Sequence, residues 1–178
     1  MHLVSAYVNP HPLAVASLKA FAPSVERVAI GPESDAYWKL MSELWAEETD
    51  CGFIEQDIEI HAAVRLEFAQ CAEPWCVFPY NGPGYGQVCD YVLTKGLGCV
   101  RFAKELVKAH PRLVADLENC TWRRLDVEVA ASLEKLGYSP HIHVPNVRQH
   151  HVYQDLCACD TDHEPFPIDD EGRYAPTE

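Results

Sequence analysis

Residues 25–57, VERVAIGPESDAYWKLMSELWAEETDCGFIEQD, contain two short apolar runs separated by a helical pattern. The runs Val25–Ile30 and Gly52–Ile54 are bounded by glycine, proline or charged residues, as β-strands are. Between them, apolar side chains recur at intervals of three and four residues, which predicts a helix: Tyr37, Leu40, Met41, Leu44 and Trp45. A strand, a helix and a second strand in this order predict a βαβ unit with parallel strands.

The same alternation continues on both sides of this unit. Leu3–Val8 predicts a strand, and Pro12–Phe21 predicts a helix that begins with a proline suited to the first turn. Ser34 is the expected N-cap of the next helix, and Ala62–Gln70 predicts a further helix. Together these elements predict an α/β fold, with a Rossmann-type, mostly parallel sheet flanked by helices in a single compact domain.

The later elements are predicted from shorter patterns: strands at 75–80, 87–93 and 141–144, and helices at 101–110 and 121–136. Gly137 follows the last helix, as expected of a C-cap. Three glycines lie in the loop at 81–86, which fits either a hairpin turn or a lid over a ligand. Their spacing is not that of a phosphate-binding loop.

Charge and composition exclude some classes of protein. The chain has 178 residues and a formal net charge of -13, which argues against non-specific wrapping of nucleic acid but not against a local basic patch. Seven acidic residues and three prolines lie in 157–178, so we expect a domain at 1–156 and an acidic tail or strap at 157–178. No apolar run approaches the roughly 20 residues of a membrane span, and no signal peptide is evident, so a cytoplasmic location is expected.

The eight cysteines are expected to be reduced thiols, most of them small core residues. The spacing of Cys71 and Cys76 is poor for a zinc knuckle. A local zinc site is an alternative near the tail, where His150 and His151 precede Cys157 and Cys159.

Two acids follow the strand Gly52–Ile54 directly. Parallel sheets bind ligands beyond the carboxyl ends of their strands, so residues 9–11, 31–34 and 55–59 are candidates for one shared site. If the chain stays extended, Glu55 and Asp57 point the same way, and Gln56 between them faces solvent. Oxygen ligands of this kind suit Mg²⁺ or Mn²⁺. The alternative is a solvated loop that carries ordinary acids.

Several blocks of the sequence resemble GT-A glycosyltransferases. Residues 17–31, 37–38 and 53–57 look like the nucleotide-binding half of that family, in which a DxD-type motif follows a strand. Here the first acid is Glu55 instead of Asp. Residues 73–80, 97–102, 122–126 and 141–145 are similar to a compact variety in actinobacterial and phage sequences, so the resemblance covers about residues 1–155. It implies a GT-A-like fold and transfer of a sugar from a nucleotide-sugar to a hydroxyl acceptor.

The resemblance also implies a metal site. Asp57 would bind Mn²⁺ or Mg²⁺ on the donor diphosphate, and Glu55 would contact the nucleotide or the metal. His143 would be a distal metal ligand, although His141 shares its face and competes for that role. The alternative for His143 is an ordinary strand histidine.

Asp126 would be the catalytic base that takes the proton of the acceptor hydroxyl, and inversion would follow from one direct displacement. The alternative is an acid favoured by the dipole at the start of a helix. Asn9, His11 and Glu33, at the ends of the first two strands, are the further candidates for donor binding.

The expected donor class is a UDP-sugar, and the acceptor stays open. A 5-hydroxymethylpyrimidine in phage DNA, a glycan, a lipid-linked sugar and a small metabolite are all candidates. Two other functions also remain: a non-catalytic module that binds a nucleotide-sugar, and an interaction protein stabilised by zinc at His150, His151, Cys157 and Cys159.

Overall fold

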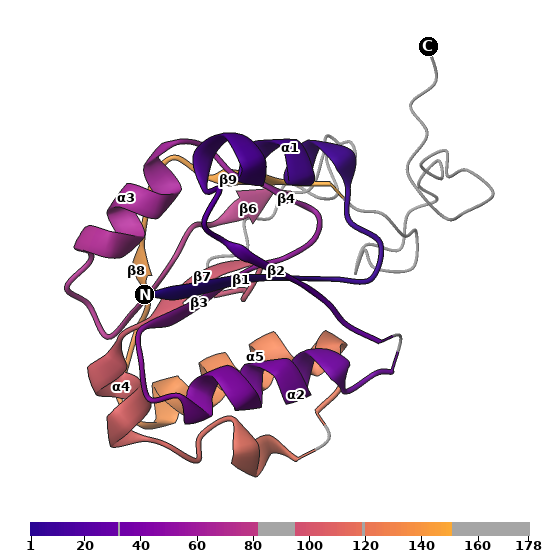
Figure 1. Cartoon of the computed structure of the whole chain (residues 1–178). Coiled ribbons are helices and arrows are strands. Elements are labelled where there is room, and N and C mark those ends of the chain that lie inside the picture. Colours follow the sequence, from indigo (N-terminus) through magenta and orange to yellow (C-terminus); the bar gives the residue numbers. More distant parts are fainter. Residues whose placement is uncertain (32, 82–94, 119, 151–178) are drawn as a thin grey trace.

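The computed structural model describes residues 1–31, 33–81, 95–118 and 120–150 (Figure 1). The predicted strand at 87–93, nearly all of the glycine loop and the predicted tail at 157–178 lie outside the described residues. Three residues of the alternative zinc site, His151, Cys157 and Cys159, lie outside them as well.

A six-stranded sheet forms the centre of the fold (Figure 1). In spatial order its strands are β2 (Glu26–Ala29), β1 (His2–Tyr7), β3 (Cys51–Ile54), β7 (Cys99–Phe102), β5 (Trp75–Val77) and β8 (His141–Ile142). β7 is antiparallel to both of its neighbours, and the other adjacent pairs are parallel. The predicted fold class, an α/β domain with a mostly parallel sheet flanked by helices, is therefore confirmed.

Helices cover both faces of this sheet (Figure 1). One layer contains α2 (Ala36–Ala46), α4 (Lys104–Ala109) and α5 (Trp122–Lys135), with a 3-10 turn at Ala115–Leu117. The other layer contains α1 (Pro12–Phe21), α3 (Ala63–Gln70) and a small sheet of β4 (Ile58–Glu59), β9 (Val147–Gln149) and β6 (Tyr80–Asn81). Across the described part of the chain, no helix has the length and apolar character that a membrane span requires.

Each layer has its own apolar core. On the first side, the predicted stripe of α2 is buried against the sheet, with Met41 fully buried and Trp45 packed edge-on against Phe102 of β7. On the second side, α1 and α3 bury Leu18, Val64 and Phe68. The apolar periodicity of the helices thus has its expected cause, which is burial of one face of each helix.

The centre of the sheet contains a strand that was not predicted, and this strand moves the start of the following helix. Residues 99–102 form the strand β7, whereas the sequence predicted that a helix begins at Arg101; α4 begins only at Lys104. All four residues of β7 are buried between β3 and β5. The charge of Arg101 obscured this strand; its guanidinium donates to Asp50 at 2.8 Å and to the carbonyl oxygen of Glu73 at 2.9 Å, while Nε has no hydrogen-bond partner within the described residues.

Ser34 is not the N-cap of α2. That position belongs to Asp35, whose side chain makes no capping hydrogen bond and instead pairs with Lys39 at 3.0 Å. Gly137 does end α5 as predicted, with a φ of 87° in the left-handed region that glycine tolerates.

Ser17 joins α1 to the strand that follows the acidic turn. Its hydroxyl donates to the carbonyl oxygen of Ala14 at 2.9 Å and accepts from the backbone N–H of Ile60 at 3.0 Å. Ser17→Ala therefore leaves a buried N–H without an acceptor, and we expect a loss of about 1–3 kcal/mol in the free energy of unfolding. Urea denaturation measures this loss. The control is Ser42→Ala, since the Ser42 hydroxyl has no hydrogen-bond partner within the described residues; equal stability of both variants would contradict the prediction.

Candidate functional site

A backbone turn follows β3 and carries the two predicted acids. The N–H of Ile58 donates to the carbonyl oxygen of Glu55 at 3.1 Å, so residues 55–58 form a turn, not the extended segment expected from the sequence. The N–H of Glu55 donates to Gly98 at 2.8 Å, and the N–H of His150 donates to the carbonyl oxygen of Asp57 at 2.8 Å. Segments distant in the sequence therefore fix this turn.

The side chains of Glu55 and Asp57 remain close despite the turn. Burial raises the pKa of Glu55, and the charges of Asp57 and Asp126 raise it further. Burial also raises the pKa of Asp57, whose side chain is almost inaccessible to solvent, while a 3.2 Å hydrogen bond from the Gln149 amide acts in the opposite direction. Like charges in a desolvated place are unfavourable unless a proton or a cation compensates them.

Asp126 lies in the first half of α5 and belongs to the same electrostatic neighbourhood. Burial raises the pKa of its carboxyl group, and the backbone N–H of Val127, which donates to Oδ1 at 2.8 Å, counteracts that shift. It does not join Glu55 and Asp57 in a group whose ligand atoms all lie within 4.8 Å of one another. The three carboxylates therefore share one electrostatic neighbourhood without forming a compact group of three metal ligands.

Two buried tyrosines that the sequence analysis did not assign to the site complete this neighbourhood. The pKa values of Tyr37 in α2 and Tyr80 in β6 are raised by burial first, and the charge of Glu55 is the next largest cause for both. The Tyr37 hydroxyl is buried and has no hydrogen-bond partner within the described residues. A buried hydroxyl without a partner requires an explanation, and a ligand or a water molecule at this position would provide one.

Gly98 leaves the space that the ring of Tyr80 occupies. A Cβ at residue 98 would lie 2.7 Å from Cε1 of Tyr80, so any other residue would displace the ring. Because the backbone of Gly98 also accepts the Glu55 N–H, the glycine couples the tyrosine to the acidic turn. A glycine before a buried strand was the only sign of this contact in the sequence.

Gln56 connects the acidic turn to the end of β1. Its Oε1 accepts the backbone N–H groups of Val8 and Asn9, each at 2.8 Å, and its carbonyl oxygen accepts the N–H of His11 at 3.0 Å. The expectation that Gln56 is a solvent-facing spacer is therefore wrong. Residues 9–11 and 55–57 do meet at one edge, as the strand-end rule predicted.

His11 has a structural role in this arrangement. It is buried at the N-cap of α1, where Nδ1 accepts the N–H of Leu13 at 3.3 Å. Its ring stacks on that of His150 with centroids 4.3 Å apart, and His150 in turn contacts Glu59 at 2.7 Å. Burial lowers the pKa of His11 to about 4, so the ring is neutral at pH 7.

The two remaining predicted residues lie elsewhere. Glu33 is exposed before α2, and its carbonyl oxygen accepts the N–H of Ala36 at 3.1 Å. His143 is buried after β8, with Nδ1 2.9 Å from Oε2 of Glu67. The imidazole of His143 lies near Cys71 and His141, in a cluster of possible metal ligands that does not include Asp57.

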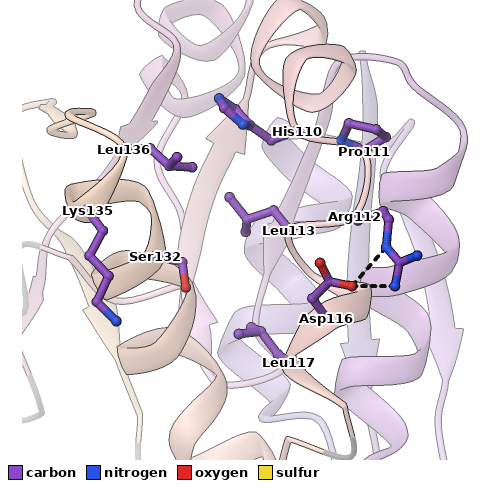
Figure 2. Close-up of a pocket in the computed structure, with 9 residues that line it drawn as sticks. All are labelled: His110, Pro111, Arg112, Leu113, Asp116, Leu117, Ser132, Lys135 and Leu136. Carbon is purple, nitrogen blue, oxygen red and sulfur yellow. Dashed lines mark hydrogen bonds and ion pairs between the residues drawn. The ribbon is translucent and has the colours of Figure 1, made fainter.

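A surface pocket lies on the first helical layer, between residues 110–117 and the end of α5 (Figure 2). Arg112 and Asp116 form an ion pair at its wall, 2.7 Å apart. Its nine lining residues include none of the site residues predicted from the sequence. The pocket therefore contributes nothing to the acidic site.

Comparisons with known proteins give one distant structural match. No family model matches the chain, and no curated protein matches it. A solved structure described as "Crystal Structure of A197 from STIV" aligns with a TM-score of 0.36 and 12% sequence identity, over 61% of this chain and 68% of that chain. A likeness of this size does not bear on function.

Proposed function

We propose that this chain is a metal-dependent glycosyltransferase that uses a nucleotide-sugar donor. The observation that supports the proposal is the pair formed by half-buried Glu55 and buried Asp57 beyond the carboxyl end of β3, beside the Tyr37 hydroxyl, which has no hydrogen-bond partner within the described residues. Open α/β sheets bind ligands at this edge. Two adjacent carboxylates fit Mn²⁺ or Mg²⁺, which bridge protein carboxylates to substrate phosphates.

Glu55 and Asp57 would hold the ion. When bound, it would neutralise charge on the departing nucleoside diphosphate. The turn at 55–58 fixes both carboxylates before any ligand arrives, because Gln56 and the backbone contacts of Glu55 and Asp57 leave it little freedom. Such preorganisation is what a charge-stabilising site requires.

Asp126 would act as the base toward the acceptor hydroxyl. It is close enough to Glu55 for its charge to raise the pKa of that residue, yet it does not complete a group of three metal ligands with Glu55 and Asp57. Partial burial raises its own pKa, which brings a carboxylate closer to the proton affinity useful in catalysis near neutral pH. The Tyr37 hydroxyl would donate a hydrogen bond to an oxygen of the donor or acceptor.

A thermal-shift titration tests the proposal. The full chain is mixed with a panel of nucleotide-sugars, UDP-sugars first, with and without Mn²⁺. A ligand that binds only the folded state raises the melting temperature with its concentration, and we expect that rise only when both Mn²⁺ and a donor are present. If no donor in the panel raises the melting temperature with Mn²⁺, the proposal fails. A rise without transfer or hydrolysis of the sugar would indicate the non-catalytic binding module.

Asp126→Asn separates chemistry from binding. We expect sugar transfer to fall by about 10²- to 10⁴-fold, the usual contribution of a general base, with the metal-dependent thermal shift retained. The matched control is Glu128→Gln on the same helix, since Glu128 pairs with Arg124 at the surface. Wild-type transfer rates in Asp126→Asn would remove the base assignment and leave Asp126 as an acid near a helix start.

The acceptor is part of the same proposal. Its candidates are the four hydroxyl compounds named from the sequence, and the net charge of -13 favours a small acceptor over duplex DNA. Transfer of labelled sugar to DNA that contains 5-hydroxymethylcytosine, compared with unmodified DNA and with free hydroxylated metabolites, distinguishes these classes.

A further inference from the structure

We propose that Cys71, His141 and His143 form a zinc site at the β8 edge of the main sheet. One potential ligand atom from each residue lies within 4.8 Å of the other two. Cys71 is the C-cap of α3, His141 lies in β8, and His143 follows that strand. A thiolate with two imidazoles is a ligand set that zinc favours.

The surroundings of His143 provide a second, independent observation. Its ring is buried, stacked against Phe78 with centroids 4.7 Å apart. Nδ1 contacts Oε2 of Glu67 at 2.9 Å, whereas Nε2 is buried and has no hydrogen-bond partner within the described residues. A buried polar nitrogen without a partner costs free energy, so its presence requires an explanation.

Glu67 supplies that explanation when it accepts the Nδ1–H of His143. This hydrogen bond fixes the tautomer in which Nε2 carries the free electron pair, as carboxylates commonly do for histidines that bind metals. Glu67 is near the end of α3, four residues before Cys71, so one helix presents both the thiol and the orienting carboxylate. The arrangement is that of a ligand with a dedicated outer partner.

The β8 strand places the two histidines. Cys76 of β5 pairs with His141, and the backbone N–H of His143 donates to Val77 at 2.9 Å, which keeps the chain extended through both residues. Residues two apart in an extended chain share a face, and the two rings lie 4.7 Å apart between centroids. Cys71 reaches the same face from the neighbouring helix.

The exposure of the ligands and the edge position of β8 indicate how the zinc would be coordinated and what it would stabilise. His141 is exposed and Cys71 is half-buried, so water completes the fourth position of a tetrahedral zinc. β8 is an edge strand of only two residues, and zinc would fasten it to the end of α3. The zinc ligands do not include any residue of the acidic turn, so the zinc proposal does not depend on the proposed glycosyltransferase activity.

Metal analysis of the full chain tests the site. We expect one zinc per chain, and replacement by Co²⁺ should give the near-ultraviolet band of a cobalt–thiolate bond. Cys71→Ser should lose that band, and Glu67→Gln should weaken zinc binding about 10- to 100-fold, as loss of an outer partner does. Because Glu67→Gln keeps all three ligands, it tests the site even if Cys71→Ser fails to fold.

The controls separate this site from the alternatives. Cys120→Ser changes a cysteine in the other core cluster and should retain zinc, as should Asp57→Asn in the acidic turn. A chain without bound zinc after purification and zinc addition would overturn the proposal. So would zinc that persists in Cys71→Ser but is lost when Cys157 and Cys159 are replaced.

Discussion

Asp57→Asn is expected to abolish the rise in melting temperature that Mn²⁺ and a nucleotide-sugar produce together, and to reduce sugar transfer by at least about 100-fold. The lower bound follows from outer partners of metal sites, whose loss already costs about 10- to 100-fold. The amide of asparagine keeps the size of the side chain but removes the charge that would hold the cation. Thermal-shift titration and transfer of labelled sugar measure the two effects.

The same variant should be more stable than the wild type when no metal is added. Asp57 is buried beside Glu55, and within the described residues its side chain accepts a hydrogen bond from Gln149, so neutralising it relieves a desolvated pair of like charges. The control is Asp116→Asn, which changes an exposed acid paired with Arg112 and should leave metal-dependent binding unchanged. A metal-dependent thermal shift of wild-type size in Asp57→Asn would contradict the metal assignment.

The second large effect is expected at Phe102, in the centre of the sheet. Its side chain is fully buried and contacts two tryptophan rings, that of Trp45 at 5.1 Å and that of Trp75 at 6.1 Å between centroids. Phe102→Ala should reduce the free energy of unfolding by about 3–5 kcal/mol, because it removes apolar contacts and leaves a cavity. Urea denaturation, followed by tryptophan fluorescence, measures the change.

Phe21 provides the comparison within the same chain. It ends α1 with 44% of its surface exposed, so Phe21→Ala should change stability by no more than about 0.5 kcal/mol. Because both substitutions remove the same atoms, the difference between them isolates the effect of burial. Similar losses in the two variants would mean that Phe102 does not belong to the apolar core.

The helices and the first strands could be predicted because their signals are local. The proline at the start of α1 and the apolar stripe of α2 lie within single elements, and the structure confirms both. β7 could not be predicted in the same way, since burial of Arg101 depends on Asp50, which lies 51 residues away in the sequence.

In the candidate site too, the residues with a local sequence pattern could be predicted, and those that depend on distant segments could not. Glu55 and Asp57 stand out because they follow a strand directly, and the strand-end rule then brings residues 9–11 to them. The sequence predicts an ordinary core residue at Tyr37 and a solvent-facing spacer at Gln56. The proximity of Tyr37 to Glu55 and the hydrogen bonds of Gln56 to the end of β1 depend on segments that are distant in the sequence. The grouping of Cys71 with His141 has no local signal in the sequence, since the two residues lie far apart and zinc motifs are recognised by short spacings.

The late position of β7 in the chain has a consequence for synthesis of the protein. Until residues 99–102 emerge, β3 keeps one edge without a partner, and β5 has no partner in the main sheet at either edge, because β8 also follows β7 in the sequence. Exposed strand edges pair readily with other chains. Fragments that stop before residue 99 should therefore aggregate, and a nascent chain needs its second half before its first half is protected.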